Sequence, residues 1–459
     1  MIISNTITIT EQDKHYREIR YFCEKNLILP NPDYIKKQRI GFWLGNTPKN
    51  IQHYTVDGFK LILPFGIIDS LKENGWIDKW ETDIPEYPDM GWDYDIGLYD
   101  YQAECSNAMV KAKHGIFIAP AGGGKTQTFI DIILKNNKKA LILTHTQDLM
   151  NQAKSRIESL TDIEVGTITD GKVNIKDITV ATVQTMCKLD LPSYATTWGT
   201  VVSDEVHRVV GSPTKQAMFY KVLNNLKCWH KYGCTATFHR GDRQEKVINY
   251  LLGEIKHEVP RSAVADKIMK VTIEKSDLDT PESDEYCGTD GMIEYAKLIN
   301  YLCENNYRNK EIAQILNENY EHSNLILSDR VAHLKELMAM VDRQDLCCIV
   351  DGTMTSKKGK EARKQALEDM RNGNKKYLFA TFSLAKEGLD IPVLDRLYLT
   401  TPHKDKAVII QSVGRIARTS KEKGEPICYD FVDVNIDFCA NAYKKRKTSY
   451  KKIDCTIKE

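Results

Sequence analysis

The stretch that decides the fold is IFIAPAGGGKTQ, residues 116–127. Its apolar beginning is typical of a buried strand, and the run breaks at Pro120 into a loop with three consecutive glycines. Glycine has no Cβ, so the backbone can bend sharply there and point its N–H groups at an anion. A helix-like segment then runs to about Leu134, and its positive dipole end would face the same point. The stretch therefore predicts a strand, a phosphate-binding loop and a helix.

Two residues at the end of this loop carry the chemistry of phosphate binding. Lys125 would reach the β- and γ-phosphates of a nucleotide, and Thr126 would ligate Mg²⁺. Ala119 stands where the usual pattern has its first glycine, so a flexible glycine turn is the alternative interpretation of this stretch taken alone. The residues expected around the phosphates are Ala121, Gly122, Gly123, Gly124, Lys125 and Thr126.

Length and composition limit the classes of protein to consider. The chain has 459 residues, enough for about three domains of ~150 residues each. Its apolar runs stay far below the ~18 residues of a transmembrane helix, and its first residues lack the pattern of a signal peptide. The 12 cysteines form no CxxC pair, which predicts a reducing, cytoplasmic compartment and no zinc site. Because the net charge is only +1, any nucleic-acid binding must come from local basic surface.

Residues 1–95 are predicted to form a small α+β module. Thr6–Thr10 alternates like a strand, residues 13–25 have helical spacing of apolar side chains, and another apolar run covers 59–68. Basic and aromatic residues mix between Tyr34 and Trp43; they either grip nucleic acid or combine an aromatic core with solvated lysines. Residues 81–95 hold six acids, no Lys or Arg and two prolines, so we expect a linker and a domain boundary there.

The rest of the chain alternates strand-like and helix-like segments, which predicts an α/β fold with two parallel-sheet domains, 96–255 and 256–459. The expected strands of the first are 115–119, 140–144, 178–181, 200–203 and 231–234. Those of the second are 268–273, 324–327, 346–350, 377–381, 395–399 and 427–431, with helices at 292–304, 309–318, 330–341 and 357–372. The basic tail, 443–459, has seven Lys or Arg against two acids and is expected to be a solvated end.

An acidic pair follows the strand expected at 200–203. Asp204 would hold Mg²⁺, directly or through water, and Glu205 would polarise the water that attacks the γ-phosphate. An acidic pair after a strand is also a helix N-cap pattern, so the interpretation depends on its place about 80 residues after Lys125. His207 either couples this site to the next motif or is a satisfied polar residue.

Two later clusters add hydroxyl groups and arginines. Thr235 and Thr237 flank a small residue at a strand end, which suits hydrogen bonds to the acidic site. Arg415 and Arg418 are three residues apart and are expected on one helical face. Arginine keeps its proton and offers a planar fork to phosphate oxygens, so this pair would act as arginine fingers on ATP; a solvated helix face is the alternative.

The motifs in this order resemble those of superfamily 2 helicases and translocases over roughly residues 96–435. The acidic motif reads DEVH, which resembles the DExH type and not the DEAD-box type. With Ala119 at its start, the glycine loop matches the A-x-x-G-x-G-K-T form of this family. The other matching segments are 99–102, 144–149, 181–185, 235–237, 325–330, 380–381 with 387–392, and 411–418.

The resemblance implies a role for each matching residue. Tyr99 and Gln102 would recognise adenine, and Gly388 and Asp390 would also contact ATP. The catalytic residues would be Lys125, Asp204, Glu205, Gln411, Arg415 and Arg418, around ATP and Mg²⁺ in a cleft between the two domains. His207, Thr235 and Thr237 would couple the site to motion. The expected DNA contacts are Thr146, Thr182, Gln184, Ser328 and Thr381.

The resemblance also implies a partner and a biological setting. The partner would be DNA, branched or at junctions of single strands with duplex, and the protein would act as a monomer. The small N-terminal module and compact frame resemble phage-encoded branch-migration helicases of the UvsW type, which implies replication, recombination or repair in the host cytoplasm. The open alternatives are a duplex translocase without strand separation, an RNA helicase, and an ATP-switched DNA-binding adaptor without useful hydrolysis.

Overall fold

The computed structural model describes residues 1–213, 216–236, 238, 244–289, 291–354, 356–386, 389, 391–420 and 423–458, with the backbone alone at 265–267, 357, 385 and 386. The chain divides into two compact units. The first comprises Met1–Pro120 and Gly124–Pro260, and the second comprises Ala121–Gly123 and Arg261–Glu459. Each unit is described by itself below.

The first unit begins with a small sheet of strand order β5-β6-β2-β1-β7. Its neighbours pair antiparallel except β1 with β7. The alternation TITIT in β2 buries Ile7 and Ile9 completely, as expected for a strand with one face on a core. The elements are β1 (Ile2–Ile3), β2 (Thr6–Thr10), α1 (Tyr16–Asn26), β5 (Thr55–Asp57), β6 (Lys60–Pro64), η1 (Phe65–Ile67), α3 (Ile68–Glu73) and β7 (Glu81–Thr82).

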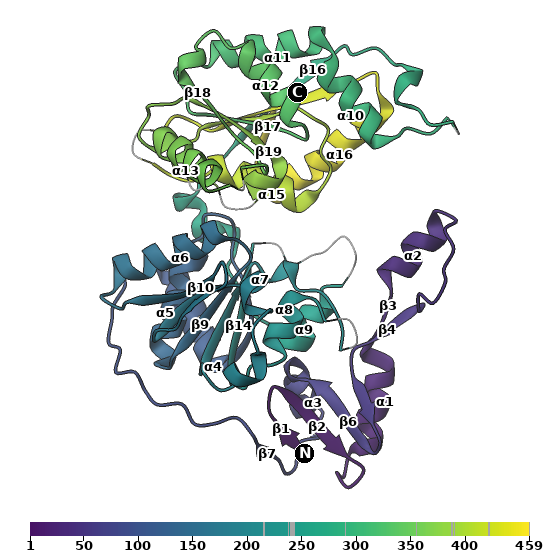
Figure 1. The fold of residues 1–459 in the computed structure, drawn as a ribbon, viewed down its shortest axis with the longest axis vertical. Coiled ribbons are helices and arrows are strands. Elements are labelled where there is room, and N and C mark those ends of the chain that lie inside the picture. The colour runs from purple at the N-terminus through teal and green to yellow at the C-terminus, as the bar shows by residue number, and fades with distance from the viewer. Residues whose placement is uncertain are drawn as a thin grey trace. The chain divides into compact units, whose positions relative to one another are not determined.

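A separate hairpin interrupts this module. Strands β3 (Ile28–Pro30) and β4 (Asn50–Gln52) pair antiparallel and carry helix α2 (Pro32–Arg39) at their far end. Figure 1 shows α2 standing clear of the five-stranded sheet. No residue of α2 is buried.

The N-terminal module packs directly on the following domain within the first unit. A Cβ at Gly66 would stand 2.0 Å from the Asn249 carbonyl oxygen, so η1 lies against the backbone of α9 (Lys246–Leu252). Asp69 of α3 accepts a hydrogen bond from Lys256 and lies 3.2 Å from Nε2 of His114. Apolar side chains of the module and of this domain form one continuous core cluster.

The acidic segment after β7 has almost no regular structure, but it is fastened along the domain that follows. The Tyr87 hydroxyl donates to the Lys227 carbonyl, and Lys138 donates to the Tyr87 carbonyl and pairs with Asp89. The backbone N–H of Trp92 donates to the side chain of Asn137. The predicted linker therefore has an extended conformation held by many contacts.

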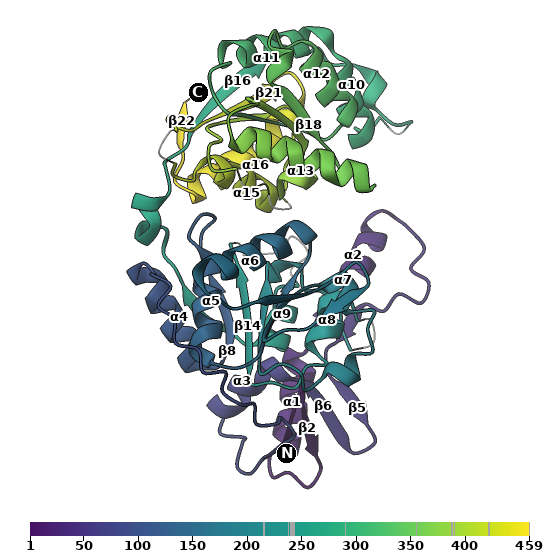
Figure 2. The same cartoon turned by 60° about the vertical axis from the view of Figure 1, so that its left-hand side comes forward.

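The second part of the first unit is an eight-stranded sheet of order β11-β10-β12-β9-β13-β14-β8-β15 among the described residues. All neighbours are parallel except the hairpin β10–β11. Strand β9, ALILT, is buried along its whole length because helices cover both faces, with α5 and α6 on one side and α8 and α9 on the other (Figure 2). The strands are β8 (His114–Ile118), β9 (Ala140–Thr144), β10 (Val165–Thr169), β11 (Lys172–Asn174), β12 (Ile178–Thr182), β13 (Thr200–Asp204), β14 (His230–Thr235) and β15 (Ile255–Glu258); the helices are α4 (Asp100–Ala112), α5 (Lys125–Asn136), α6 (Gln147–Leu160), α7 (Val183–Met186), η2 (Leu191–Tyr194), η3 (Val206–Arg208) and α8 (Met218–Leu223).

The second unit is built on a seven-stranded sheet of order β18-β19-β17-β20-β21-β16-β22 among the described residues, with every neighbouring pair parallel. Helices α10 to α12 lie on one side of it and α13, α15 and α16 on the other (Figure 1). The strands are β16 (Thr272–Leu278), β17 (Asn324–Ser328), β18 (Cys347–Val350), β19 (Tyr377–Thr381), β20 (Arg396–Leu399), β21 (Ile427–Asp433) and β22 (Thr456–Lys458); the helices are η4 (Arg261–Lys267), η5 (Asp284–Tyr286), α10 (Tyr295–Glu304), α11 (Asn306–Glu318), α12 (Val331–Ala339), η6 (Gln344–Leu346), α13 (Lys357–Arg371), α14 (Phe382–Lys386), α15 (Lys406–Ile416) and α16 (Asp437–Lys452).

Three predictions about local structure are wrong. The strand expected at 268–273 runs instead from Thr272 to Leu278, because its backbone pairs with β21 through a charged stretch that an apolar pattern does not reveal. The tail is not a solvated end: it contributes most of α16, with Arg446 buried, and strand β22. Arg415 and Arg418 do not share a helical face, because α15 ends at Ile416 and Arg418 follows it in a bridge to Ile268.

No helix in the described part of the chain is both long and apolar enough to span a membrane. The fold class predicted from the sequence, two parallel-sheet domains in tandem after a small α+β module, is confirmed.

Candidate functional site

The sheet order of the first unit brings three motifs together. Strand β14 lies between β13 and β8, so the ends of these three strands are adjacent. Asp204 ends β13 and Glu205 follows it, Thr235 ends β14, and the glycine-rich loop follows β8. The backbone N–H of Ala119 donates to the Thr235 carbonyl, 3.1 Å away. Because ligands of parallel sheets bind outside the carboxyl ends of strands, this edge is the candidate nucleotide site.

The glycine-rich loop has the backbone that only glycine adopts freely. Gly122 and Gly124 have φ values of 83° and 73°. Nε2 of Gln102 donates a hydrogen bond to the Gly124 carbonyl oxygen, 3.5 Å away. A Cβ at Gly124 would stand only 2.0 Å from the same nitrogen, so a larger residue would clash there. The buried Gln102 side chain also accepts from the N–H of Tyr99 at 3.0 Å. The segment predicted to recognise adenine therefore contacts the end of the phosphate loop directly.

The charged residues of the site lie close together. Nζ of Lys125, at the start of α5, lies 3.6 Å from Oε1 of Glu205. Glu205 itself adopts the left-handed conformation, with φ of 52°, and its N–H donates to Oδ1 of Asp204 at 2.9 Å. Burial and the neighbouring Glu205 raise the pKa of Asp204. Burial alone would also raise the pKa of Glu205, but the charge of Lys125 and a hydrogen bond from His207 bring it below its ordinary value.

A network of side chains links the acidic pair to the end of β14. The Thr235 hydroxyl donates to Oε2 of Glu205 at 3.3 Å. Nδ1 of His207 lies 3.1 Å from the same oxygen and 3.2 Å from the Thr235 hydroxyl. Glu205 is thus held from two sides by groups that suit its ionised form. Thr237, the other predicted coupling residue, lies outside the described residues.

The residues present fit a Mg²⁺ ion. Asp204 offers a carboxylate at the end of β13, and Thr126 offers a hydroxyl in the first turn of α5. Oxygen ligands of this kind are those that Mg²⁺ prefers. A divalent cation would also favour the charged form of Asp204, whose burial works against its ionisation.

Two residues of this site were not assigned a role from the sequence. The thiol of Cys234 donates to Oδ1 of Asp204 at 3.2 Å, so a buried cysteine touches the expected metal ligand. His145 is buried at the end of β9, and its charge is among the influences that lower the pKa of Glu205. His145 lies within the matching segment 144–149 and Cys234 directly precedes the segment 235–237, but only the adjacency of strands β9, β13 and β14 places them beside the acidic pair.

The predicted nucleic-acid contacts of the first unit follow neighbouring strands. Thr146 caps α6 by accepting from the N–H of Leu149 at 3.3 Å. Thr182 ends β12 and is buried, with its hydroxyl donating to Thr185 at 3.1 Å. Gln184 is exposed, and its side chain donates to the carbonyl of His145 at 2.6 Å.

In the second unit, the two predicted contacts lie side by side. Ser328 and Thr381 are paired positions at the ends of β17 and β19. Ser328 is buried, and its hydroxyl lies 3.0 Å from Nδ1 of His333, whereas Thr381 is half-buried and bonds Ser383.

The predicted catalytic residues of the second unit lie on or just after α15. Gln411 is buried in this helix, and its side-chain oxygen accepts no hydrogen bond from the described residues. Arg415 is in the last turn and Arg418 follows the helix. Gly388 and Asp390, predicted to contact ATP, lie outside the described residues.

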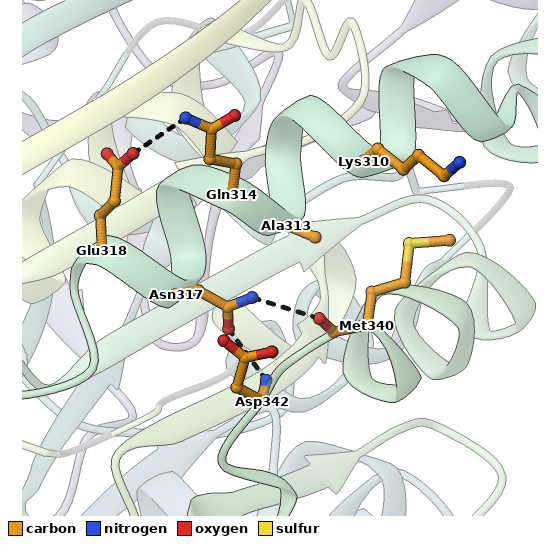
Figure 3. A pocket seen from close by; sticks show the side chains of 7 residues that line it. All are labelled: Lys310, Ala313, Gln314, Asn317, Glu318, Met340 and Asp342. Atoms are coloured by element: carbon orange, nitrogen blue, oxygen red, sulfur yellow. Dashed lines mark hydrogen bonds between the residues drawn. The ribbon is translucent and has the colours of Figure 1, made fainter.

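One hollow of the second unit lies away from all these residues. Figure 3 shows it between α11 and the end of α12. Its polar groups already bond one another: Asn317 donates to the Met340 carbonyl and accepts from the Asp342 N–H, and Gln314 donates to Glu318. We therefore assign it no role in the site.

Two protein families match this chain. The family described as "Type III restriction enzyme, res subunit" matches residues 95–240, and "Helicase conserved C-terminal domain" matches residues 307–420. The first match includes the phosphate loop and the acidic pair, and the second includes Arg415.

Individual relatives and solved structures are also similar to this chain. A mimivirus protein (Acanthamoeba polyphaga mimivirus) named as an ATP-dependent RNA helicase is 27% identical over 94% of this chain and 84% of its own length. The DNA 3'-5' translocase XPB2 of Sulfurisphaera tokodaii is 26% identical over 70% of this chain and 79% of its own. The solved structure of S. cerevisiae Dbp5 bound to RNA and ADP BeF3 matches 79% of this chain and 94% of its own, at 16% identity and a TM-score of 0.52. The crystal structure of T4 UvsW matches 97% of this chain and 96% of its own, at 18% identity and a TM-score of 0.39.

The fold and the site agree with these matches. The two parallel-sheet domains are of the RecA-like kind, and the phosphate loop, acidic pair and Thr235 meet at one sheet edge. The two family models match in the order that the motifs predicted, and together with the helicase relatives they support a superfamily 2 helicase.

Proposed function

We propose that this helicase hydrolyses ATP to move on DNA, and that it unwinds or migrates branched DNA such as forks and Holliday junctions. The observation that carries the proposal is the network in which Lys125, His207 and Thr235 all hold the carboxylate of Glu205. Such an arrangement suits a general base or water-orienting group that must stay ionised.

Each residue of the site has a proposed task. Lys125 binds the β- and γ-phosphates, while the N–H groups of the glycine-rich loop surround them. Asp204 and Thr126 hold Mg²⁺, which would neutralise charge developing on the phosphates. Glu205 orients the attacking water and accepts its proton, and Gln102 and Tyr99 recognise the base. His207 and Thr235, with Thr237, transmit the state of Glu205 to the rest of the domain.

The second domain is proposed to complete the reaction. Arg415 and Arg418 stabilise the negative charge of the γ-phosphate as it is transferred, and Gln411, Gly388 and Asp390 assist in binding. Binding of ATP would then favour one arrangement of the domains and hydrolysis would release it, because the γ-phosphate has different affinities for the two states.

The nucleic acid is proposed to follow the ends of β9 and β12 in one domain and of β17 and β19 in the other. Thr146, Gln184 and Thr381 would supply side-chain contacts to phosphates, which position the strand without reading its bases. The side chains of Thr182 and Ser328 are buried, so their backbone amides are the proposed contacts.

Further parts of the proposal concern organisation and setting. We propose domain boundaries at 1–95, 96–255 and 256–459, action as a monomer, and work in replication, recombination or repair in the cytoplasm of a phage host. A second candidate, an RNA helicase, is favoured by the name of the mimivirus relative, which covers most of both chains.

A substrate panel tests the proposed function. ATP hydrolysis and strand separation are measured on forked, four-way and blunt linear DNA and on an RNA duplex, with Lys125→Ala as the inactive control. The proposal expects activity on branched DNA and weak dependence on base sequence. Equal activity on linear duplex would contradict branch migration, and activity on the RNA duplex alone would show that the substrate is RNA and not DNA.

One substitution tests the mechanism. Glu205→Gln keeps the shape of the side chain but removes its charge, so ATP should still bind while turnover is lost, by about 10²–10⁴-fold. Unchanged turnover would show that the assigned role of Glu205 is wrong. An adaptor without useful hydrolysis would show no DNA-stimulated turnover even in the wild type.

A further inference from the structure

The hairpin arm of the N-terminal module, residues 31–49, exposes aromatic and basic side chains together. Trp43 is 87% exposed and Phe42 is 68% exposed. The same segment carries Lys36, Lys37, Arg39 and Lys49 against a single acid, Asp33. Apart from Asn31, no residue of the arm is buried. Large apolar side chains gathered on an exposed projection indicate a binding surface.

The root of the arm is firmly held. Strands β3 and β4 pair from Ile28 to Gln52, and the backbone N–H of His53 donates to the Leu27 carbonyl at 2.8 Å. Tyr250 of α9 donates to the Asn26 carbonyl at 2.6 Å, and its ring packs against that of His53, 5.2 Å away. The arm therefore stands at a fixed place on a domain that carries the ATP site.

The tip of the arm has its own internal order. The side chain of Asn31 caps α2 and also donates to the Pro48 carbonyl at 2.8 Å. Lys37 donates to the Thr47 hydroxyl at 2.7 Å. A Cβ at Gly45 would stand 3.0 Å from the Trp43 ring, so the ring lies against the Gly45 backbone with its remaining surface open to solvent.

We propose that this arm binds an unpaired base of the nucleic acid, with the Trp43 ring as the stacking surface, Phe42 beside it, and the basic residues contacting flanking phosphates. The positive charge of the arm indicates which partner it binds. Cationic side chains can contact the phosphates of a single-stranded nucleic acid while its bases stack on exposed aromatic rings. The proposal rests on the proposed function, because a helicase acting at a fork produces unpaired bases next to the duplex.

Binding without nucleotide tests the arm directly. Fluorescence anisotropy of labelled forked DNA is compared for the wild type, Trp43→Ala and Trp43→Phe, at one fixed salt concentration. Trp43→Ala should weaken binding roughly tenfold, since one base–aromatic stack is lost. Trp43→Phe should retain most of the affinity. The matched control is Phe59→Ala, which removes an aromatic side chain that is 73% exposed in the turn between β5 and β6.

Two further measurements distinguish base stacking from nonspecific binding. Addition of an oligothymidylate should quench wild-type tryptophan fluorescence more than that of Trp43→Phe. Replacing Lys36 and Arg39 by Gln should reduce the slope of log affinity against log salt by about one per phosphate contact. Binding to blunt duplex should change little in Trp43→Ala, because its bases are already stacked.

The outcomes are distinct. Equal binding by wild type and Trp43→Ala, or an equal loss in Phe59→Ala, overturns the proposal. A self-association that is seen in sedimentation and abolished by Trp43→Ala also overturns it, in favour of an interface between copies. These assays need no ATP turnover. A protein without ATPase activity would therefore contradict the proposed function, while binding of nucleic acid by the arm could still be measured and interpreted.

Discussion

The buried ion pair of Arg446 and Asp430 gives a prediction about the part of the chain that the sequence suggested was solvated. Nε and Nη2 of Arg446 donate to the two carboxylate oxygens of Asp430 at 2.9 and 2.7 Å. Tyr450 donates to the same carboxylate. Burial would lower the pKa of Arg446, but Asp430 and Tyr450 raise it above its ordinary value, so the guanidinium keeps its charge. Both side chains are almost completely buried.

Replacing Arg446 by Met keeps most of the volume but leaves the Asp430 carboxylate buried with one partner. Two hydrogen bonds to Asp430 and one to the His403 carbonyl are lost, and breaking a buried pair in this way typically costs about 3–5 kcal/mol. For a unit of the size of Arg261–Glu459, this corresponds to a fall of about 6–20 °C in melting temperature.

The measurement is hydrogen exchange of peptides from β21 and α16, together with urea unfolding followed by circular dichroism. All six tryptophans precede residue 260, so tryptophan fluorescence reports the first unit and serves as an internal control. The matched variant is Lys445→Met, at an exposed neighbour on α16, which should change stability by less than about 0.5 kcal/mol.

A double variant completes the argument. Asp430→Asn with Arg446→Met removes both charges, so it should be less destabilised than the sum of the single variants by about 1–3 kcal/mol. If Arg446→Met protects β21 and α16 from exchange as well as Lys445→Met does, the buried pair does not hold this helix and the reasoning is refuted.

Three further predictions concern the first unit. Thr235→Val removes the hydroxyl that donates to Glu205, so the rate of ATP hydrolysis at saturation should fall about 10- to 100-fold with ATP affinity retained, as steady-state kinetics and nucleotide titration would show. Gly124→Ala introduces a Cβ 2.0 Å from Nε2 of Gln102 at a φ of 73°, so ATP binding should weaken at least about tenfold in a titration with a fluorescent analogue. Burial lowers the pKa of His53 to about 4 from an ordinary 6.5, so the unfolded state takes up the proton first as pH falls. The contribution of His53 to the free energy of unfolding should therefore decrease by about 3 kcal/mol between pH 6.5 and 4, and His53→Phe should remove this contribution, as urea unfolding at several pH values would show.

Controls separate these effects from general damage. Thr235→Ser keeps the hydroxyl and should retain most activity; the same loss as in Thr235→Val would mean that packing, and not the hydrogen bond, matters. Gly75→Ala has a similar positive φ with no atom within 4 Å, so weaker ATP binding in that variant as well would argue against the clash with Gln102. An unchanged pH profile in His53→Phe would assign the acid sensitivity to other groups.

The local hydropathy pattern predicted strand limits correctly where apolar side chains dominate a segment. Strand β9 is apolar from Ala140 to Leu143 and ends in the buried Thr144, and its predicted limits, 140–144, agree with the structure because a strand covered on both faces is a nearly continuous apolar run. The pattern failed at β16, TIEKSDL, whose strand conformation comes from pairing with β21 and β22 and not from its own composition. It also failed for Arg446, since nothing in a lysine-rich tail shows that one of its cations faces a buried carboxylate.

The sequence by itself determined the order of the motifs and the residue types that handle phosphate, because glycine, lysine and carboxylate act through local geometry and charge. It therefore predicted the two-domain α/β class and the resemblance to superfamily 2 helicases. Only the tertiary structure decided which distant side chains meet: β14 lies beside β13, so Thr235 and Cys234 contact the acidic pair from positions 30 residues away along the chain. The arm was likewise decided by the tertiary structure, because exposure of Trp43 depends on what the rest of the chain leaves uncovered.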